Sequence, residues 1–148
     1  MKDITIKIVG KQFDGDEVGN EMVFVSDGKM YHRAGAHYLV YDDSELFGFA
    51  GSRTRLKITE DTVRMKRIGG KTESGFDENL ESEMIFQEGK RFQSIYATPY
   101  GAIGMEVLTK ELKNELSPEG FGKVSLDYVI SFQGAGEGRN ALDIEITQ

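Results

Sequence analysis

Short segments in which apolar and polar residues alternate dominate this chain. Residues 4–8 read ITIKI, and residues 124–132 read VSLDYVISF, with an apolar residue at every second position. Side chains on a β-strand point alternately to two faces, so this period of two predicts strands with one buried face. The pattern recurs at residues 22–24, 30–32, 38–40, 56–58, 63–65, 84–86, 92–96, 103–107 and 142–146. Gly, Asn, Asp or Ser bounds these runs, as is typical of strands joined by turns.

Residues 105–120 (MEVLTKELKNELSPEG) also fit a helix. Leucines spaced by four, many Glu and Lys residues, and a final Pro and Gly favour helical structure for residues 108–117. Met105, Val107 and Thr109 share one strand face, however, and the flanking segments fit a β-meander. We therefore predict a strand at least to Lys110.

The segment TPYG at residues 98–101 has the residue preferences of a type I turn. Proline cannot donate a hydrogen bond to a neighbouring strand, so Pro99 belongs between strands. We interpret this segment as a turn that joins residues 92–97 to residues 102–107, with Tyr100 at its tip.

Many antiparallel strands with hairpin connections must form two sheets or close on themselves. We predict an all-β fold, a closed antiparallel up-and-down barrel of about 8–10 strands. The chain has 148 residues and shows neither a repeat nor a linker, so it is predicted to be a single domain spanning residues 1–148.

The predicted inner face is rich in flexible methionines and in aromatic residues, which suit either a packed core or an apolar pocket. These residues are Met22, Phe24, Met30, Met65, Met84, Phe86, Phe92, Met105 and Phe132. For a small apolar or amphipathic ligand, with an anionic group allowed, the expected contacts are Arg67, Met65, Met84, Phe86, Phe92, Tyr96, Met105 and Tyr100.

The charge is distributed unevenly. The net charge is −7, but residues 53–71 carry seven cations and two acids, a local charge of +5. A turn at Glu60 and Asp61 would place four cations on one face of a hairpin: Arg55, Lys57, Arg64 and Lys66. Like charges across strands are destabilising, so either nearby acids or an anionic partner must compensate. This predicts the alternative function, a protein- or RNA-interaction module, although the overall charge disfavours nucleic acid.

The residue types exclude several kinds of chemistry. The chain has no cysteine, which excludes disulfides and thiolate sites and fits a cytoplasmic location. The first ten residues contain no apolar run of the length expected for a signal peptide, and no apolar run is long enough to predict a membrane span. His32 and His37 flank a predicted turn without a third ligand at a diagnostic spacing, so we predict no metal and no cofactor. No catalytic constellation is found, and we predict no enzymatic activity. Exposed edge strands would allow a homodimer.

Four stretches of the second half carry a resemblance to a known family. VRMKRIGG, MIFQEGKR, YATPYGAIGMEVLTKEL and SLDYVISFQG with ALDIEI resemble the YwiB-like family of uncharacterised bacterial proteins. The resemblance covers roughly residues 54–147. It implies a calycin-like or lipocalin-like β-barrel, and it implies no reaction, substrate or catalytic residue.

Overall fold

The computed structural model describes residues 1–42, 53–72, 75–98, 101–132 and 136–148. These residues form one antiparallel sheet of ten strands. The strands are β1 (Lys2–Asp14), β2 (Glu17–Arg33), β3 (Ala36–Asp42), β4 (Arg53–Ile58), β5 (Thr62–Thr72), β6 (Gly75–Gln87), β7 (Arg91–Thr98), β8 (Gly101–Asn114), β9 (Gly122–Phe132) and β10 (Gly136–Thr147). This part of the chain contains no helix that could span a membrane.

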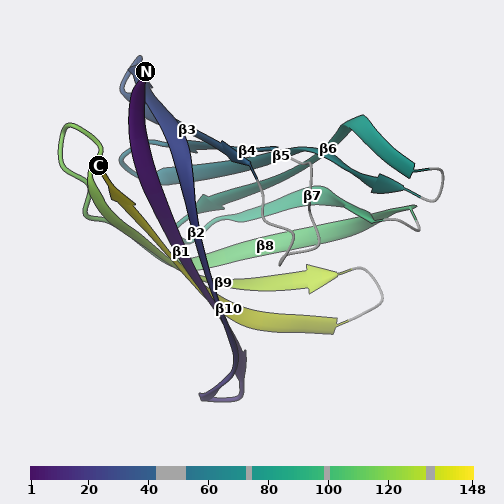
Figure 1. Cartoon of the computed structure of the whole chain (residues 1–148). Coiled ribbons are helices and arrows are strands. Elements are labelled where there is room, and N and C mark those ends of the chain that lie inside the picture. The colour runs from purple at the N-terminus through teal and green to yellow at the C-terminus, as the bar shows by residue number, and fades with distance from the viewer. Residues whose placement is uncertain (43–52, 73–74, 99–100, 133–135) are drawn as a thin grey trace.

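The sheet curls into a nearly closed barrel (Figure 1). Every pair of consecutive strands except β6 and β7 is hydrogen-bonded, and the first and last strands pair with each other, for example Ile6 with Ile146. Across the sheet, the strand order is β6-β5-β4-β3-β2-β1-β10-β9-β8-β7. β6 and β7 lie close together at the two ends of this order, but no ladder joins them among the described residues. The predicted all-β, up-and-down barrel is confirmed.

Alternating strand directions give the barrel two ends. We call the end at which β5, β7 and β9 finish the distal end. The opposite end carries the β8–β9 loop and both chain termini, and we call it the proximal end. In Figure 1 the strand ends of the distal end lie to the right, and the termini lie to the left.

The strand predicted at residues 105–110 is confirmed and extends to Asn114. Met105, Val107 and Thr109 are all buried on its inner side. A β-bulge between Thr109 and Glu111 then shifts the alternation by one residue, so that Leu112 pairs with Leu126 and packs against the core. The leucine spacing that resembles a helix thus arises from a strand with a bulge.

The proximal part of the interior is tightly packed. Leu56, Val63, Phe86 and Ile144 are each 0% exposed. The Phe86 ring meets the Tyr128 ring edge-on across the barrel, with 4.9 Å between their centroids. Burying this apolar surface is the main contribution to the stability of the fold.

Backbone hydrogen bonds within the β8–β9 loop fix its shape at this end. The amide of Glu115 donates to the carbonyl of Lys123 (3.0 Å), and the amide of Ser117 donates to the carbonyl of Phe121 (2.8 Å). Gly122 has a φ of 136°, and a Cβ at this position would lie 2.5 Å from the Glu115 carbonyl oxygen. Only glycine fits this backbone position.

Candidate functional site

Inward-facing side chains become less buried toward the distal end. Met65 pairs with Met84, and Met105 pairs with Phe132. Met65, Met84 and Phe132 are half-buried and pack against the core, whereas Met105 is 4% exposed. Methionine and aromatic side chains from β5, β6, β8 and β9 therefore line this end of the barrel.

Polar side chains share this lining. Arg67 belongs to the inward-facing row of β5, where its backbone neighbours are Thr54 on β4 and Ser82 on β6. It is half-buried. Directly after it, a bulge at Gly69, whose φ is 88°, shifts the register of β5 against β6. The regular alternation of inward-facing and outward-facing side chains on β5 therefore ends directly after Arg67.

Ser94 was not singled out from the sequence. It pairs with Met105, and its Oγ atom is buried without a hydrogen-bond partner among the described residues. A recess of 590 Å³ at this position is lined by Ser94, Met105 and Phe132 together with neighbouring residues of β7–β9. The alternation places Ser94 on the same strand face as Phe92, but only the folded barrel shows that its hydroxyl is buried without a partner among the described residues.

The remaining predicted ligand contacts lie in different surroundings. Phe86 is enclosed in the packed core against Tyr128. Phe92 is half-buried and pairs with Val107. The side chain of Tyr96, and Tyr100 as a whole, lie outside the described residues.

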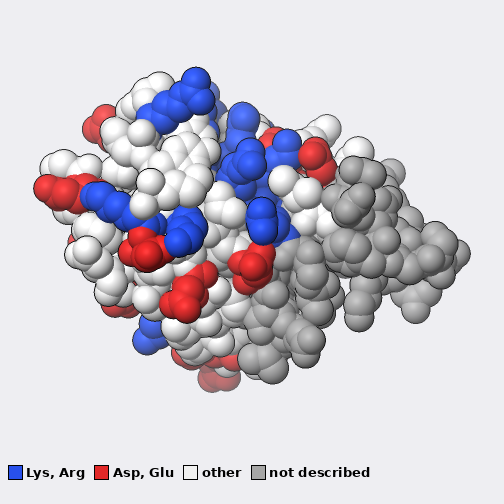
Figure 2. All heavy atoms as spheres, turned by 45° about the horizontal axis from the view of Figure 1, so that its top comes forward, with Lys and Arg blue, Asp and Glu red and all other residues white. Residues whose placement is uncertain are grey.

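The outer side of the β4–β5 hairpin carries the basic face, defined as Arg55, Lys57, Arg64 and Lys66. The predicted register is confirmed, because Arg55 opposes Lys66 and Lys57 opposes Arg64. The amide of Thr59 donates to the carbonyl of Thr62 (2.9 Å) and closes the predicted turn. Figure 2 shows Lys and Arg side chains gathered side by side on this side of the molecule, with acidic residues around them.

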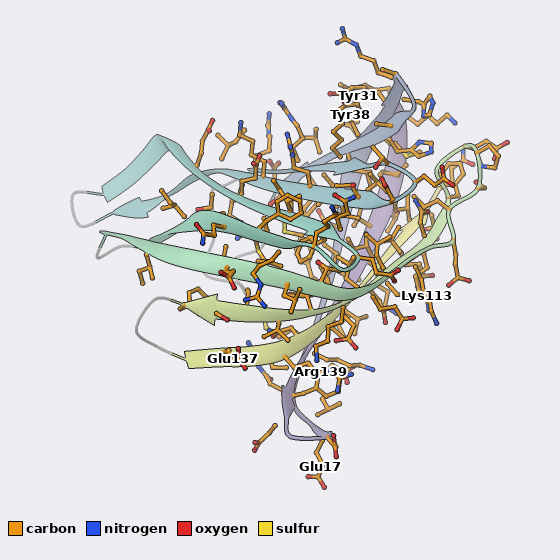
Figure 3. All side chains as sticks on the ribbon, turned by 180° about the vertical axis from the view of Figure 1, so that it is seen from behind. Glu17, Tyr31, Tyr38, Lys113, Glu137 and Arg139 are labelled. Carbon is orange, nitrogen blue, oxygen red and sulfur yellow. The ribbon has the colours of Figure 1, made fainter. Side chains whose placement is uncertain are left out.

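Two tyrosines lie beside the basic face on the same side of the sheet, Tyr38 on β3 next to Lys57 and Tyr31 on β2. Tyr31 and Tyr38 oppose each other and stack with 4.9 Å between ring centroids and 5° between ring planes (Figure 3). The Lys57 ammonium lies 5.8 Å from the Tyr38 ring centroid, within the range of a cation–π interaction.

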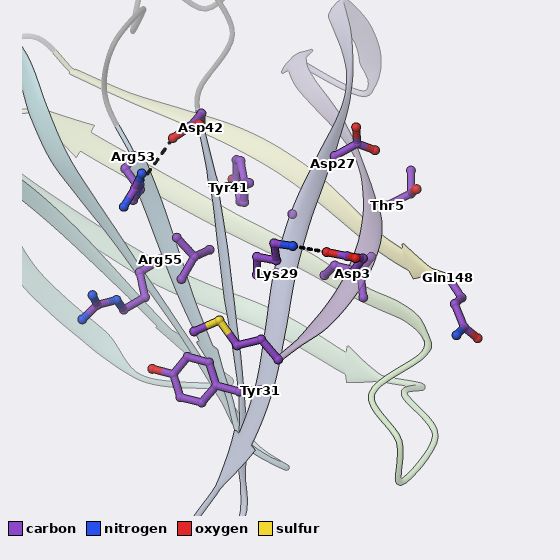
Figure 4. Close-up of a pocket in the computed structure, with 14 residues that line it drawn as sticks. Asp3, Thr5, Asp27, Lys29, Tyr31, Tyr41, Asp42, Arg53, Arg55 and Gln148 are labelled. Carbon is purple, nitrogen blue, oxygen red and sulfur yellow. Dashed lines mark hydrogen bonds and ion pairs between the residues drawn. The ribbon is translucent and has the colours of Figure 1, made fainter.

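A groove on the outside of β1–β4 adjoins these residues (Figure 4). It measures 920 Å³, and its lining includes Asp3, Asp27, Lys29, Tyr31, Arg53 and Arg55. Two ion pairs cross it: Lys29 binds Asp3, and the Arg53 Nε atom lies 3.3 Å from the Asp42 carboxylate. The lining therefore mixes positive and negative charge.

The two histidines face each other across the β2–β3 hairpin, with 3.1 Å between their Nδ1 atoms. Burial, followed by electrostatic interaction with His32 and Lys2, lowers the pKa of His37 below its ordinary value of 6.5. Among the described residues, no group of three or more His, Asp or Glu side chains is placed to hold a metal ion.

The fold and these sites define a nearly closed antiparallel β-barrel with a methionine-lined distal end and a basic outer face. The chain belongs to the family described as Domain of unknown function (DUF1934), whose model matches residues 6–144. It is similar to the solved crystal structure of the ywiB protein from Bacillus subtilis, with a TM-score of 0.68, 16% sequence identity, and coverage of 97% of this chain and 90% of that chain.

At this identity the similarity shows the fold alone. The predicted YwiB-like resemblance is confirmed by the family and structural matches. Comparison with curated protein sequences gives no match.

Proposed function

We propose that the protein binds a small amphipathic molecule, with an anionic group, inside the distal end of the barrel. The observation that carries this proposal is the change in burial along the barrel. Proximal side chains such as Val63 and Phe86 are fully enclosed, whereas Met65 and Met84, the next inward residues on the same two strands, are half-buried. An apolar ligand would cover this surface, and its burial would favour binding.

The types of side chain at this end suit such a molecule. Methionines adapt their shape to an irregular apolar ligand. The buried Ser94 hydroxyl would gain a hydrogen bond to a polar atom of the ligand, which removes the cost of its missing partner. A guanidinium such as that of Arg67 binds carboxylate, sulfonate or phosphate groups through two parallel hydrogen bonds. We place this ligand in the cytoplasm, consistent with a chain that has no cysteine.

A pair of fluorescent probes tests the proposal directly. 1-Anilinonaphthalene-8-sulfonate and N-phenyl-1-naphthylamine share their aromatic rings, and only the first carries a sulfonate. We expect both probes to bind the folded protein and to compete with each other. Replacing Arg67 with Gln should weaken binding of the sulfonate probe and leave the uncharged probe unchanged.

Apolar truncations locate the site. Met65→Ala and Met84→Ala should each raise the Kd of both probes about tenfold, because each removes roughly one methionine side chain of apolar contact. The matched control is Leu112→Ala, since Leu112 is also half-buried against the core but lies toward the proximal end. Equal Kd values in the folded methionine variants and the wild type would refute the proposal. Native mass spectrometry of freshly purified protein would show whether a natural ligand is retained.

A further inference from the structure

We propose that the basic face, together with Tyr38 and Tyr31, is a docking surface for an acidic segment of another protein. The first reason is the direct opposition of like charges. Arg55 opposes Lys66, and Lys57 opposes Arg64, on the solvent side of two paired strands. Opposed cations destabilise a sheet, so the fold on its own gains nothing from this arrangement. An anionic partner would turn the repulsion into attraction.

The second reason is that the described residues compensate these charges only in part. Lys66 forms an ion pair with Glu81 at 3.4 Å, and Lys57 lies over Tyr38. Arg55 and Arg64 are exposed, and no carboxylate of the described residues lies within ion-pair distance of either. Two guanidinium groups thus remain available in a chain whose net charge is −7.

The composition of the surface is that of a protein interface. Arginine and tyrosine are the side chains that most often dominate binding energy between proteins. The Tyr31 and Tyr38 rings stack on each other, and Lys57 lies over the Tyr38 ring. These contacts already restrict both side chains, so little side-chain entropy is lost when another protein covers them.

The geometry fits an extended chain. Arg55 and Lys57 are two residues apart on one strand and so stand about 7 Å from each other. An extended acidic segment presents alternate side chains at the same spacing of about 7 Å. Carboxylates at alternate positions would therefore meet successive cations of the basic face.

The borders of the surface favour protein over nucleic acid. Asp3, Asp27 and Asp42 lie in the adjoining groove, and Glu81 and Glu83 flank the other side on β6. A long run of phosphates would be repelled on leaving the four cations, whereas a protein segment can place lysines beside these acids.

The test uses a fluorescein-labelled peptide of alternating Glu and Ser, with an alternating Lys and Ser peptide and oligouridylate as competitors. The full-length protein should bind the acidic peptide, and its affinity should fall steeply between about 50 and about 300 mM NaCl. The variant Arg55→Gln/Arg64→Gln should bind about tenfold more weakly. The charge-matched control, Lys110→Gln/Lys123→Gln on β8 and β9, changes two exposed cations outside the face and should bind as the wild type does.

Circular dichroism of each variant confirms that it is folded. Loss of peptide binding in the Arg55/Arg64 variant alone supports the proposal. Absence of binding to the wild type, or an equal loss in both double variants, overturns it. Tighter binding of oligouridylate than of the acidic peptide would also overturn it and would assign the surface to RNA.

Discussion

Charge at position 64 should control the stability of the β4–β5 hairpin. Lys57 directly opposes Arg64 on β4, and Ile85 opposes it on β6. A directly opposed pair of charges changes stability by roughly 0.2–1 kcal/mol. Arg64→Gln removes the repulsion from Lys57 and a weaker diagonal attraction to Glu83, and should raise the free energy of unfolding by about 0.5 kcal/mol. Arg64→Glu adds an attraction to Lys57, which is offset in part by repulsion from Glu83, the diagonal neighbour of position 64 on β6. This substitution should raise the free energy of unfolding by about 1 kcal/mol.

Urea unfolding at low ionic strength measures these free energies, and thermal unfolding should show a rise in Tm of about 2–4 °C for Arg64→Glu. The gain should shrink in about 1 M NaCl, where the Debye length is about 3 Å. Lys110→Gln and Lys110→Glu provide the control at an exposed position of β8. The reasoning is refuted if Arg64→Glu is no more stable than Arg64→Gln, or if the changes at position 110 match those at position 64.

Further predictions concern the backbone, the core and two titratable groups. Gly122→Ala should lower the free energy of unfolding by about 2 kcal/mol or more, because its Cβ would meet the Glu115 carbonyl oxygen at 2.5 Å. Phe86→Ala should cost about 3–5 kcal/mol through the cavity it leaves. The folded protein lowers the pKa of His37 below the value of 6.5 that it has in the unfolded chain, so stability should fall as pH drops through 6.5 toward the lowered folded-state pKa. Burial raises the pKa of Tyr128 to about 12, so its phenolate absorbance should appear only at about that pH or on unfolding.

The predictions for Gly122, His37 and Tyr128 each have a control. Gly10→Ala, whose Cβ would make only an ordinary contact of 3.7 Å with Leu142, should change stability far less than Gly122→Ala does. His37→Asn should flatten the pH dependence of stability below about pH 7; an unchanged slope contradicts the assignment. Tyr128→Phe should remove the late phenolate transition, and persistence of that transition in the variant would assign it to another tyrosine.

Local features of the fold could be predicted from the sequence because they depend on neighbouring residues. The period of two identified the strands, and a turn at Glu60 and Asp61 was sufficient to fix which cations oppose each other on β4 and β5. The same reasoning, applied to His32 and His37, would also have placed Tyr31 opposite Tyr38. The aromatic pair was therefore present in the sequence, although it was not recognised there.

Long-range features could not be predicted in this way. β1 pairs with β10 in the middle of the strand order, although their residues lie at opposite ends of the chain. Alternation identifies the two strands without showing that they are partners. The outer groove has the same difficulty, because its lining comes from four strands and the C-terminal residue. The buried Ser94 hydroxyl becomes notable only once the barrel encloses it.

The two proposed sites share a strand, yet they can be tested separately. On β5, Arg64 and Lys66 face solvent, whereas Met65 and Arg67 face the interior. Because adjacent residues point to opposite faces, a substitution on one face leaves the other face chemically unchanged. Arg64→Glu should therefore stabilise the barrel and abolish peptide docking while leaving the binding of both fluorescent probes intact. Arg64 would then lower the stability of the hairpin but allow an acidic segment to bind, as expected where function and stability conflict.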